Sequence, residues 1–412
     1  MDDCIEYPLD PGATFTPAPP VGELPARYRS AFSMWFKGRK PDGSLILPTP
    51  EEVKKAPERH LENLRAHLQG ALQVELFTLP PYLTALLSIP DGQANLWPAQ
   101  VMRSVIMEEM LHMTLVANLL NAVGGQVVLD EGCILQRYPS RIPFSGLAFD
   151  VELQPLSSEG INTLRKVEVP EQLAPKNPPK DYDLGFTSLS EYYFVVESML
   201  HTLSEALGEG AVFSGERARQ FPASSYYGGG GRVVEVHDLA SAMRAINEIS
   251  LQGEGGRPGD PKRTEERPVS VFVDDRREGE VYTPTHFFRF DELLRGRRYV
   301  WGDRPGAPTG APLSIDFEAI YPMLPNPHQS DFADWPEIAR ALARFNGTFT
   351  GLLLQLHGAF AGHHDRFKHA VALMYELKYQ GQALMRTPNP RVPGCTVGTP
   401  FEWNAEAVIE KP

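Results

Sequence analysis

Residues 101–125 read VMRSVIMEEMLHMTLVANLLNAVGG, and this stretch decides the fold. Its apolar residues recur every three or four positions, which places them on one face of an α-helix that ends at Gly124 and Gly125. Glu109 and His112 lie within this apolar face, and Glu108 lies at its edge. A buried carboxylate costs several kcal/mol unless it is neutralised, paired or bound to a metal ion. The stretch therefore predicts a core helix that carries a functional group into the interior.

The preceding segment, LENLRAHLQGALQVELFTLPPYLTALLSI at residues 61–89, shows the same pattern. Its leucines form one stripe, and Glu75 falls in the middle of that stripe. Two buried carboxylates with an imidazole one turn away are a donor set that suits a metal ion such as iron. Pro80 and Pro81 follow Glu75 and free two backbone carbonyls, so the helix either kinks there or ends and restarts.

The order of the remaining segments predicts the architecture. A proline-rich stretch with short β-like runs, residues 126–186, separates these two helices from a third at about 188–208. A fourth helix follows Asp238, its expected N-cap, and two more cover about 335–360 and 364–386. Two helices, a long crossover and two more helices are the plan of the ferritin-like bundles. The expected fold is mainly α: a ferritin-like four-helix bundle with a long crossover, β-containing insertions and a C-terminal helical hairpin.

Three regions are expected along the chain. Residues 1–50 are rich in proline and glycine and predict an extended N-terminal arm. Residues 51–330 predict the metal-binding bundle with its inserted loops. Residues 331–412 predict a C-terminal helical hairpin and tail packed on the bundle.

The sequence of the third and fourth helices does not decide which residues complete the metal site. Glu197 and His201 both lie off the apolar face of the third helix, and periodicity does not choose between them. Glu254 lies at the edge of the stripe of the fourth helix. Di-metal carboxylate bundles use two Glu-x-x-His motifs, but this chain has only the one at Glu109 and His112. The alternative to a metal site is a buried Glu–His pair held by hydrogen bonds.

Composition narrows the class of function. The chain has 412 residues with a formal net charge of −13 spread along it, which argues against nucleic acid as a partner. It has no apolar run of membrane-spanning length, and its acidic start does not resemble a secretory signal. Cys4, Cys133 and Cys395 are isolated, so neither a disulfide framework nor a thiolate zinc site is expected. Free cysteines of this kind predict a cytoplasmic location.

Several segments together resemble a known family. QVELFTLPPYL, IMEEMLHMTLVANLLNAVGG, EYYFVVESM, AINEISLQGEG and THFFRF occur in this order, followed by FNGTFTGLLLQLHGAF, AVALMYELKYQGQALM and GTPFEW. Over about residues 55–405 the chain is similar to the ferritin-like domain of the iminophenyl-pyruvate dimer synthase group. The best-known members couple two imine molecules of indole-3-pyruvate in violacein and rebeccamycin biosynthesis.

The resemblance implies an iron-binding ferritin-like fold in specialised metabolism. It selects Glu197 over His201 on the third helix, and it brings in His286 of THFFRF as the second histidine. The implied metal ligands are Glu75, Glu109, His112, Glu197, Glu254 and His286. Tyr82, Phe194 and Phe288 are the expected substrate-lining residues.

The leading hypothesis is a non-haem oxidase or oxygenase that holds two iron ions, with manganese as the alternative metal. Its expected partners are dioxygen or peroxide and a small amino-acid-derived or aromatic metabolite, and the sequence leaves room for a homo-oligomer. The sharper alternative is oxidative coupling of amino-acid imines. The alternative from another class is a non-catalytic ferritin-like metal-binding or partner protein.

Overall fold

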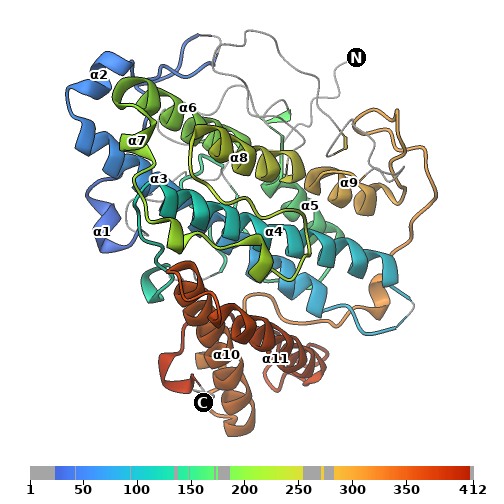
Figure 1. The fold of residues 1–412 in the computed structure, drawn as a ribbon. Coiled ribbons are helices and arrows are strands. Elements are labelled where there is room, and N and C mark those ends of the chain that lie inside the picture. The colour runs from blue at the N-terminus through green and yellow to red at the C-terminus, as the bar shows by residue number, and fades with distance from the viewer. Residues whose placement is uncertain are drawn as a thin grey trace.

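A computed structural model shows a helical protein with no β-sheet in the part of the chain that it describes (Figure 1). The structure describes residues 24–41, 43–92, 94–133, 138–147, 149–170, 173–174, 186–253, 271–272 and 283–408. The α-helices are α1 (Ala26–Arg29), α2 (Pro50–Lys54), α3 (Pro57–Leu87), α4 (Leu96–Ala122), α5 (Ser158–Val167), α6 (Leu189–Leu207), α7 (Glu209–Val212), α8 (Leu239–Gly253), α9 (His286–Arg295), α10 (Pro336–Phe360) and α11 (Arg366–Arg386).

Helices α3, α4, α6 and α8 form a four-helix bundle. Helix α3 packs against α4 and α6, and α8 packs against the same two helices, so the four close a ring (Figure 1). Their apolar stripes meet in one continuous core. The mainly helical four-helix bundle expected from the sequence is confirmed.

The two prolines do not end the first bundle helix. Helix α3 runs without a break from Pro57 to Leu87 with Pro80 and Pro81 inside it. Pro81 has no amide hydrogen to donate to the carbonyl of Phe77, one turn earlier. The Tyr138 hydroxyl donates to that carbonyl instead, at 2.7 Å. One of the two hydrogen bonds lost to the prolines is thus replaced from outside the helix, and α3 continues through both prolines.

The crossover between α4 and α6 contains a helix that the sequence analysis did not expect. The side chain of Ser157 accepts a hydrogen bond from the amide of Gly160 and caps α5. The β-like runs do not pair into a sheet in the described part of the crossover. They form isolated bridges, of which one joins Ser140 to Val151.

Two further helical pairs complete the fold. Helix α9 packs against α5 at one side of the bundle. Helix α5 also contacts α3, and α9 also contacts α4. Helices α10 and α11 pack tightly on each other as a hairpin, which projects from one end of the bundle (Figure 1). Residues 1–23 of the expected N-terminal arm lie outside the described residues.

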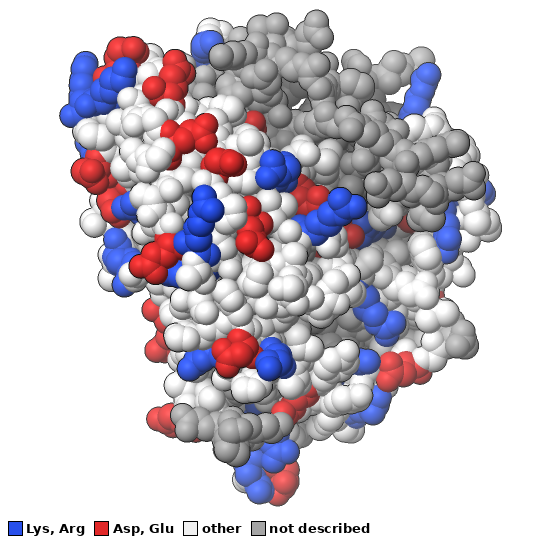
Figure 2. All heavy atoms as spheres, viewed as in Figure 1, with Lys and Arg blue, Asp and Glu red and all other residues white. Residues whose placement is uncertain are grey.

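The described surface mixes both signs of charge. On the face shown in Figure 2, lysine and arginine side chains alternate with aspartate and glutamate, without a broad patch of either sign among the coloured residues. None of the helices in the described ranges combines the length and apolarity of a membrane span.

Candidate metal centre

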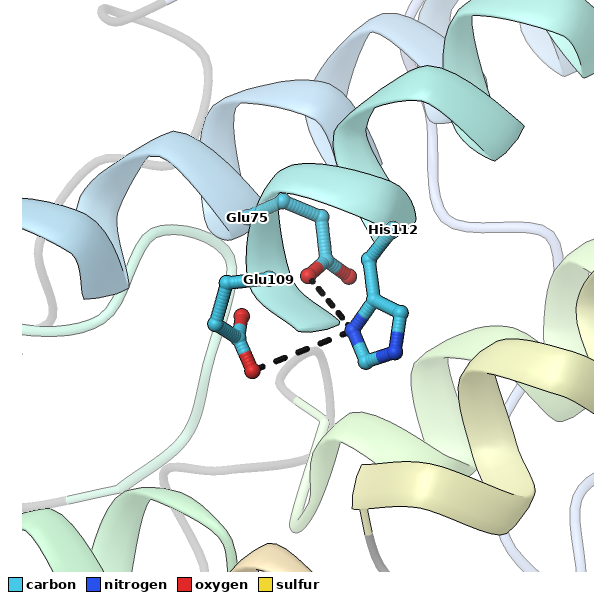
Figure 3. A group of neighbouring side chains, drawn as sticks. All are labelled: Glu75, Glu109 and His112. Atoms are coloured by element: carbon cyan, nitrogen blue, oxygen red, sulfur yellow. Dashed lines mark ion pairs between the residues drawn. The ribbon is translucent and has the colours of Figure 1, made fainter. Parts of the chain in front are cut away.

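Helices α3 and α4 place the first group of side chains in the bundle interior. Glu75 comes from α3, Glu109 and His112 come from α4, and all three are buried (Figure 3). The Nδ1 atom of His112 lies 3.4 Å from Oε2 of Glu75 and 3.8 Å from Oε1 of Glu109. One donor atom from each residue falls within 4.8 Å of the other two, a spacing that one metal ion can bridge.

A second group shares Glu109 with the first. His286 is the first residue of α9, and Glu168 follows the last residue of α5. The Nδ1 atom of His286 lies 2.9 Å from Oε1 of Glu109 and 3.5 Å from Oε2 of Glu168. All three residues are buried, and their donor atoms again lie within 4.8 Å of one another. The two groups form one centre because Glu109 belongs to both, and the rings of His112 and His286 stack with centroids 5.6 Å apart.

The far side of the His112 ring is held by Gln252 of α8. The amide nitrogen of Gln252 donates to the carbonyl of Gly230 and to Glu248, which turns its oxygen toward His112. Nε2 of His112 therefore donates to Oε1 of Gln252, at 3.0 Å. In the neutral ring the bare nitrogen is then Nδ1, the atom that faces Glu75 and Glu109.

The glycine-rich loop makes this contact possible. A Cβ atom on Gly230 would come within 2.6 Å of the backbone oxygen of Met107, and Gly230 has a φ of +78°. A side chain at this position would push the loop away from α4. Glycine lets the loop backbone lie against α4 and present its carbonyl to Gln252.

Glu108 holds the second imidazole in the same manner. Nε2 of His286 donates to Oε2 of Glu108 at 2.8 Å, and Arg289 donates to both oxygens of that carboxylate at 2.9 Å. Burial raises the pKa of Glu108, but the charge of Arg289 and the bond with His286 outweigh it and lower the pKa. Nδ1 of His286 is fully buried, and although Oε1 of Glu109 lies 2.9 Å away, the two atoms do not have the geometry of a hydrogen bond. A buried nitrogen left without a hydrogen bond beside two carboxylates is the arrangement of a metal ligand.

A hydroxyl group steadies each of the three carboxylates. Tyr193 donates to Oε1 of Glu75, and Tyr82 donates to Oε1 of Glu168. The Thr78 hydroxyl lies 2.9 Å from Oε2 of Glu109. The other oxygen of each carboxylate faces an imidazole Nδ1. Each carboxylate thus has one oxygen held by the protein and one oxygen directed to the centre.

The buried carboxylates of the centre are stabilised by positive charge, either from protons or from a metal ion. Burial and the charges of Glu168 and Glu75 raise the pKa of Glu109 to about 7, against the opposing contact with His286. Burial lowers the pKa of His286, but its contacts with Glu108, Glu109 and Glu168 outweigh burial and raise that pKa well above its usual value. Without a metal ion, protons must therefore hold the carboxylates together.

The donor set fits a divalent transition-metal ion. Three carboxylates and two neutral imidazoles supply oxygen and nitrogen donors, and no thiolate takes part. The bare and buried Nδ1 of His286 supports the same assignment. We therefore assign Glu75, Glu109 and His112 to one candidate metal position, and Glu109, Glu168 and His286 to the other.

A pocket leads to the centre between α6 and α8. Its cavity volume is about 20 Å³, which is room for one or two water molecules. Glu75, Glu109, His112 and Glu168 form its inner wall. Residues near the start of α6 and the end of α8 form the rest. A molecule of the size of water or dioxygen in this pocket would lie directly against the metal-facing carboxylates.

The structure brings together four of the six predicted ligands: Glu75, Glu109, His112 and His286. Glu197 is buried on α6 but belongs to neither group, and its carboxylate lies 3.9 Å from His201. Glu254 lies outside the described residues.

The three predicted lining residues have different positions. Tyr82 contacts the centre through Glu168, with its hydroxyl as the donor. Phe288 packs in a separate small apolar cluster with Tyr299, and Phe194 is half-buried on α6. Neither phenylalanine lines the pocket at the centre, where Tyr193 is the aromatic residue.

Sequence reasoning missed Glu168 and placed Glu108 at the edge of the helix face. Residues 157–168 did carry a signal, since Ser157 is a cap and Leu164 lies one turn before Glu168 on the same buried face. Glu108 is buried because α9 covers that side of α4 and supplies Arg289. The apolar stripe of one helix does not show whether another element of the fold also covers a second face of that helix.

The buried Asp291 joins α5 to α9, the two short helices that supply Glu168 and His286 to the second metal position. Asp291 of α9 accepts from Arg165 of α5 at 2.5 Å and from the Tyr299 hydroxyl at 2.6 Å. We expect Asp291→Asn to loosen α5 against α9 and to weaken metal binding at the second position by up to about 10-fold, less than the loss of a direct hydrogen-bond partner of a ligand costs. Metal titration of the variant would show one tight and one weakened ion.

The control for this variant is Arg295→Ala. Arg295 also contacts Asp291 but is 40 % exposed, and it does not join α5 to α9. It should leave both ions in place. Equal weakening of both positions in Asp291→Asn would contradict the assigned role.

Comparison with known proteins agrees with the fold. The family model described as Ferritin-like matches residues 68–295, more than half of the chain and the span from α3 to the end of α9. None of the curated proteins matches the chain.

Among solved structures, the chain is similar to a ferritin-like protein from Caulobacter vibrioides. The TM-score is 0.54 and the sequence identity 22 %, and the match covers 82 % of this chain and 97 % of the other. At this identity the likeness concerns the fold alone. The family match, the four-helix ring and the shared-carboxylate centre lead to the same conclusion: this chain belongs to the ferritin-like family.

Proposed function

We propose that this protein is a non-haem, di-iron oxidase or oxygenase that acts on a small amino-acid-derived or aromatic metabolite with dioxygen or peroxide. The observation that carries the proposal is Glu109, whose carboxylate belongs to two ligand groups at once. A carboxylate shared by two positions is how ferritin-like bundles hold a metal pair. The family also includes di-iron oxidases, which is compatible with this chemistry.

The residues of the centre have distinct tasks. Glu75, Glu109 and Glu168 would offset the charge of the ions, and His112 and His286 would bind them through Nδ1. Gln252 and Glu108 keep both rings in the tautomer that leaves Nδ1 free. When bound, the metal pair supplies the electrons and the binding site for dioxygen or peroxide.

The surrounding protein controls access to the centre. The ligands are buried in the bundle core, and the small pocket between α6 and α8 would admit dioxygen or peroxide to them. Burial keeps bulk water from the reacting groups and strengthens their electrostatic interactions. The hydroxyls of Tyr193 and Tyr82 keep Glu75 and Glu168 in place while substrate enters.

Metal loading tests the proposal. The purified chain, incubated with ferrous iron without oxygen and then desalted, should retain about two iron ions per chain. Admission of oxygen or peroxide should then cause its consumption, followed with an oxygen electrode or by peroxide absorbance. Failure to retain any transition metal under reducing, anaerobic loading would refute the proposal. Retention without consumption of either oxidant favours a non-catalytic metal-binding protein.

Two finer alternatives have their own assays. The resemblance of the sequence motifs to the iminophenyl-pyruvate dimer synthase group supports oxidative coupling of amino-acid imines. Dimer formation from the imine of indole-3-pyruvate, detected by mass spectrometry, would select it. Rapid disproportionation of peroxide by the manganese-loaded protein would instead select a manganese catalase-like activity.

A further inference from the structure

The loop that holds Gln252 against His112, residues 222–233, is fixed to α4 at both of its ends. The amide of Phe221 donates to Oδ1 of Asn118 at 2.6 Å, and Nδ2 of Asn118 donates to the carbonyl of Val234 at 2.9 Å. One side chain of α4 therefore joins the start of the loop to its end. The part between these contacts contains two tyrosines followed by four glycines, YYGGGG at 226–231.

The glycine tip of the loop lies against α4 and reaches α8. A Cβ atom on Gly229 would collide with the side chain of Met107, so the backbone itself packs on α4. The carbonyl of Gly230 accepts from Nε2 of Gln252 at 2.9 Å. Oε1 of the same amide faces Nε2 of His112 at 3.0 Å. The position of the tip therefore determines which end of the Gln252 amide is presented to the ring.

The two tyrosines before the glycines rest on the C-terminal hairpin. The ring of Tyr227 is stacked on that of Phe367 of α11, at an interplanar angle of 15° and a centroid distance of 6.1 Å. The rings of Tyr226 and Phe367 are 5.7 Å apart, and the two tyrosine rings stack on each other at 4.6 Å. Phe367 is buried, with its ring 4.8 Å from that of Phe221 at the start of the loop. The hairpin thus supports the loop immediately before its tip.

The proton of a neutral His112 has two possible positions. Oε2 of Glu75 lies 3.4 Å from Nδ1 and would accept a proton carried there. Oε1 of Gln252 accepts the proton from Nε2 instead, and Nδ1 is then bare. Because a carboxylate is the stronger acceptor, the Nε2 position is kept only while the amide oxygen of Gln252 is held toward the ring.

We propose that Phe367, Tyr226 and Tyr227 are positioning residues for the metal centre. Through these three rings the C-terminal hairpin holds the glycine loop, and the loop keeps Nδ1 of His112 free to bind a metal ion. The hairpin thus acts on the centre although it supplies none of the assigned ligands. The inference rests on the proposed function only for the metal ion, because the proton position on His112 is measurable without metal.

The first measurement is nitrogen-15 NMR of the histidine rings in the metal-free full chain, at an alkaline pH where His112 is neutral. His112→Gln identifies the signals of this ring. The wild type should carry the proton on Nε2. In the double variant Tyr226→Ala/Tyr227→Ala the loop loses its support, so a second form with the proton on Nδ1, directed to Glu75, should appear. Tyr226→Phe/Tyr227→Phe keeps both rings and should restore the wild-type form.

Three further variants complete the series. Gly230→Ala moves the tip directly and leaves the ring stack in place, so it should produce the same proton shift. Tyr379→Ala is the matched control, since Tyr379 is a tyrosine of α11 that is 65 % exposed and is not part of the stack. Tyr227→Ala alone removes a ring that is 42 % exposed, and it replaces the double variant if that protein does not fold.

The second measurement is a metal titration that resolves the two positions. The alanine double variant should weaken the first position, which includes His112, by about 3- to 10-fold, less than the loss of a direct hydrogen-bond partner of a ligand costs. The second position should keep its affinity, because Glu168 and His286 are held by α5 and α9.

The outcomes separate this inference from the proposed function. A wild-type proton position in the folded alanine variant would overturn the inference, even if Gly230→Ala shifts the proton. Equal weakening of both metal positions would overturn it as well, since a general loosening of the bundle has that effect. A wild-type protein that retains no metal would refute the proposed function, and the proton shift would still support the role of the hairpin.

Discussion

Replacing Glu109 by glutamine or alanine is expected to remove both metal ions from the centre. Glu109 belongs to both ligand groups, so its loss takes one donor from each position. Losing a residue that only hydrogen-bonds a metal ligand costs about 10- to 100-fold in metal affinity. Glu109 is itself a ligand, so we expect the apparent affinity at both positions to fall by more than about 100-fold. His112→Ala should weaken only the first position, because Nδ1 of His286 still faces Glu109 and Glu168.

The measurement is metal content after anaerobic loading, together with a titration that resolves the two ions. Glu205→Ala is the control, since Glu205 lies exposed on α6 away from the pocket. Circular dichroism of the metal-free variants verifies that the bundle is folded. A Glu109→Gln protein that retains one ion at wild-type affinity would show that the two groups do not share this carboxylate.

Deprotonation of Glu109 between about pH 5 and 8 is expected to destabilise the metal-free protein, and the same rise in pH is expected to tighten metal binding. The pKa of Glu109 is about 7 in the folded chain against a reference value of 4.5. A raised pKa means that the folded state binds the proton more tightly than the unfolded state. This contribution to stability is complete below about pH 4.5 and is lost as the pH rises through 7. The loss is on the order of 3 kcal/mol for this group.

The histidines act in the same direction. Burial lowers the pKa of His112, but its contacts with Glu75 and Glu109 outweigh burial and raise it, so its proton also stabilises the fold until the pH passes that value. Metal ions need the deprotonated forms of all these groups, so binding releases protons and strengthens as the pH rises. The lowered pKa values of Glu75 and Glu108 oppose this in acid, where stability is lost as the pH falls below about 4.5. Burial lowers the pKa of His67 to about 4, so this ring opposes it between about pH 5 and 6.5.

Urea unfolding in the presence of a chelator at several pH values measures the first effect. Calorimetric metal titrations in buffers of different ionisation enthalpy measure the released protons. Glu109→Gln should flatten the pH dependence of the free energy of unfolding, because it removes the titrating carboxyl group. A free energy of unfolding that falls no further between pH 5 and 8 in the wild type than in Glu109→Gln would contradict the expected sign.

The bundle helices could be predicted from the sequence because each buries one long apolar stripe. Helices α3, α4, α6, α8, α10 and α11 lie close to where periodicity placed them. The helices α5 and α9 were not expected, since each has only ten residues and lies among proline- and glycine-rich segments. Ten residues show fewer than three turns, so their apolar faces are short and their context suggested loops.

The sequence by itself determined the helical bundle and the half of the centre on its two longest helices. Glu75, Glu109 and His112 could be found because a carboxylate or imidazole within a long apolar stripe must face the core. Only the tertiary structure decided the other half. It brings Glu168 and His286 to Glu109 from two short helices far apart in the chain, and it buries Glu108 under α9. Contacts between distant short elements depend on how the chain packs, and the periodicity of any one helix does not contain that information.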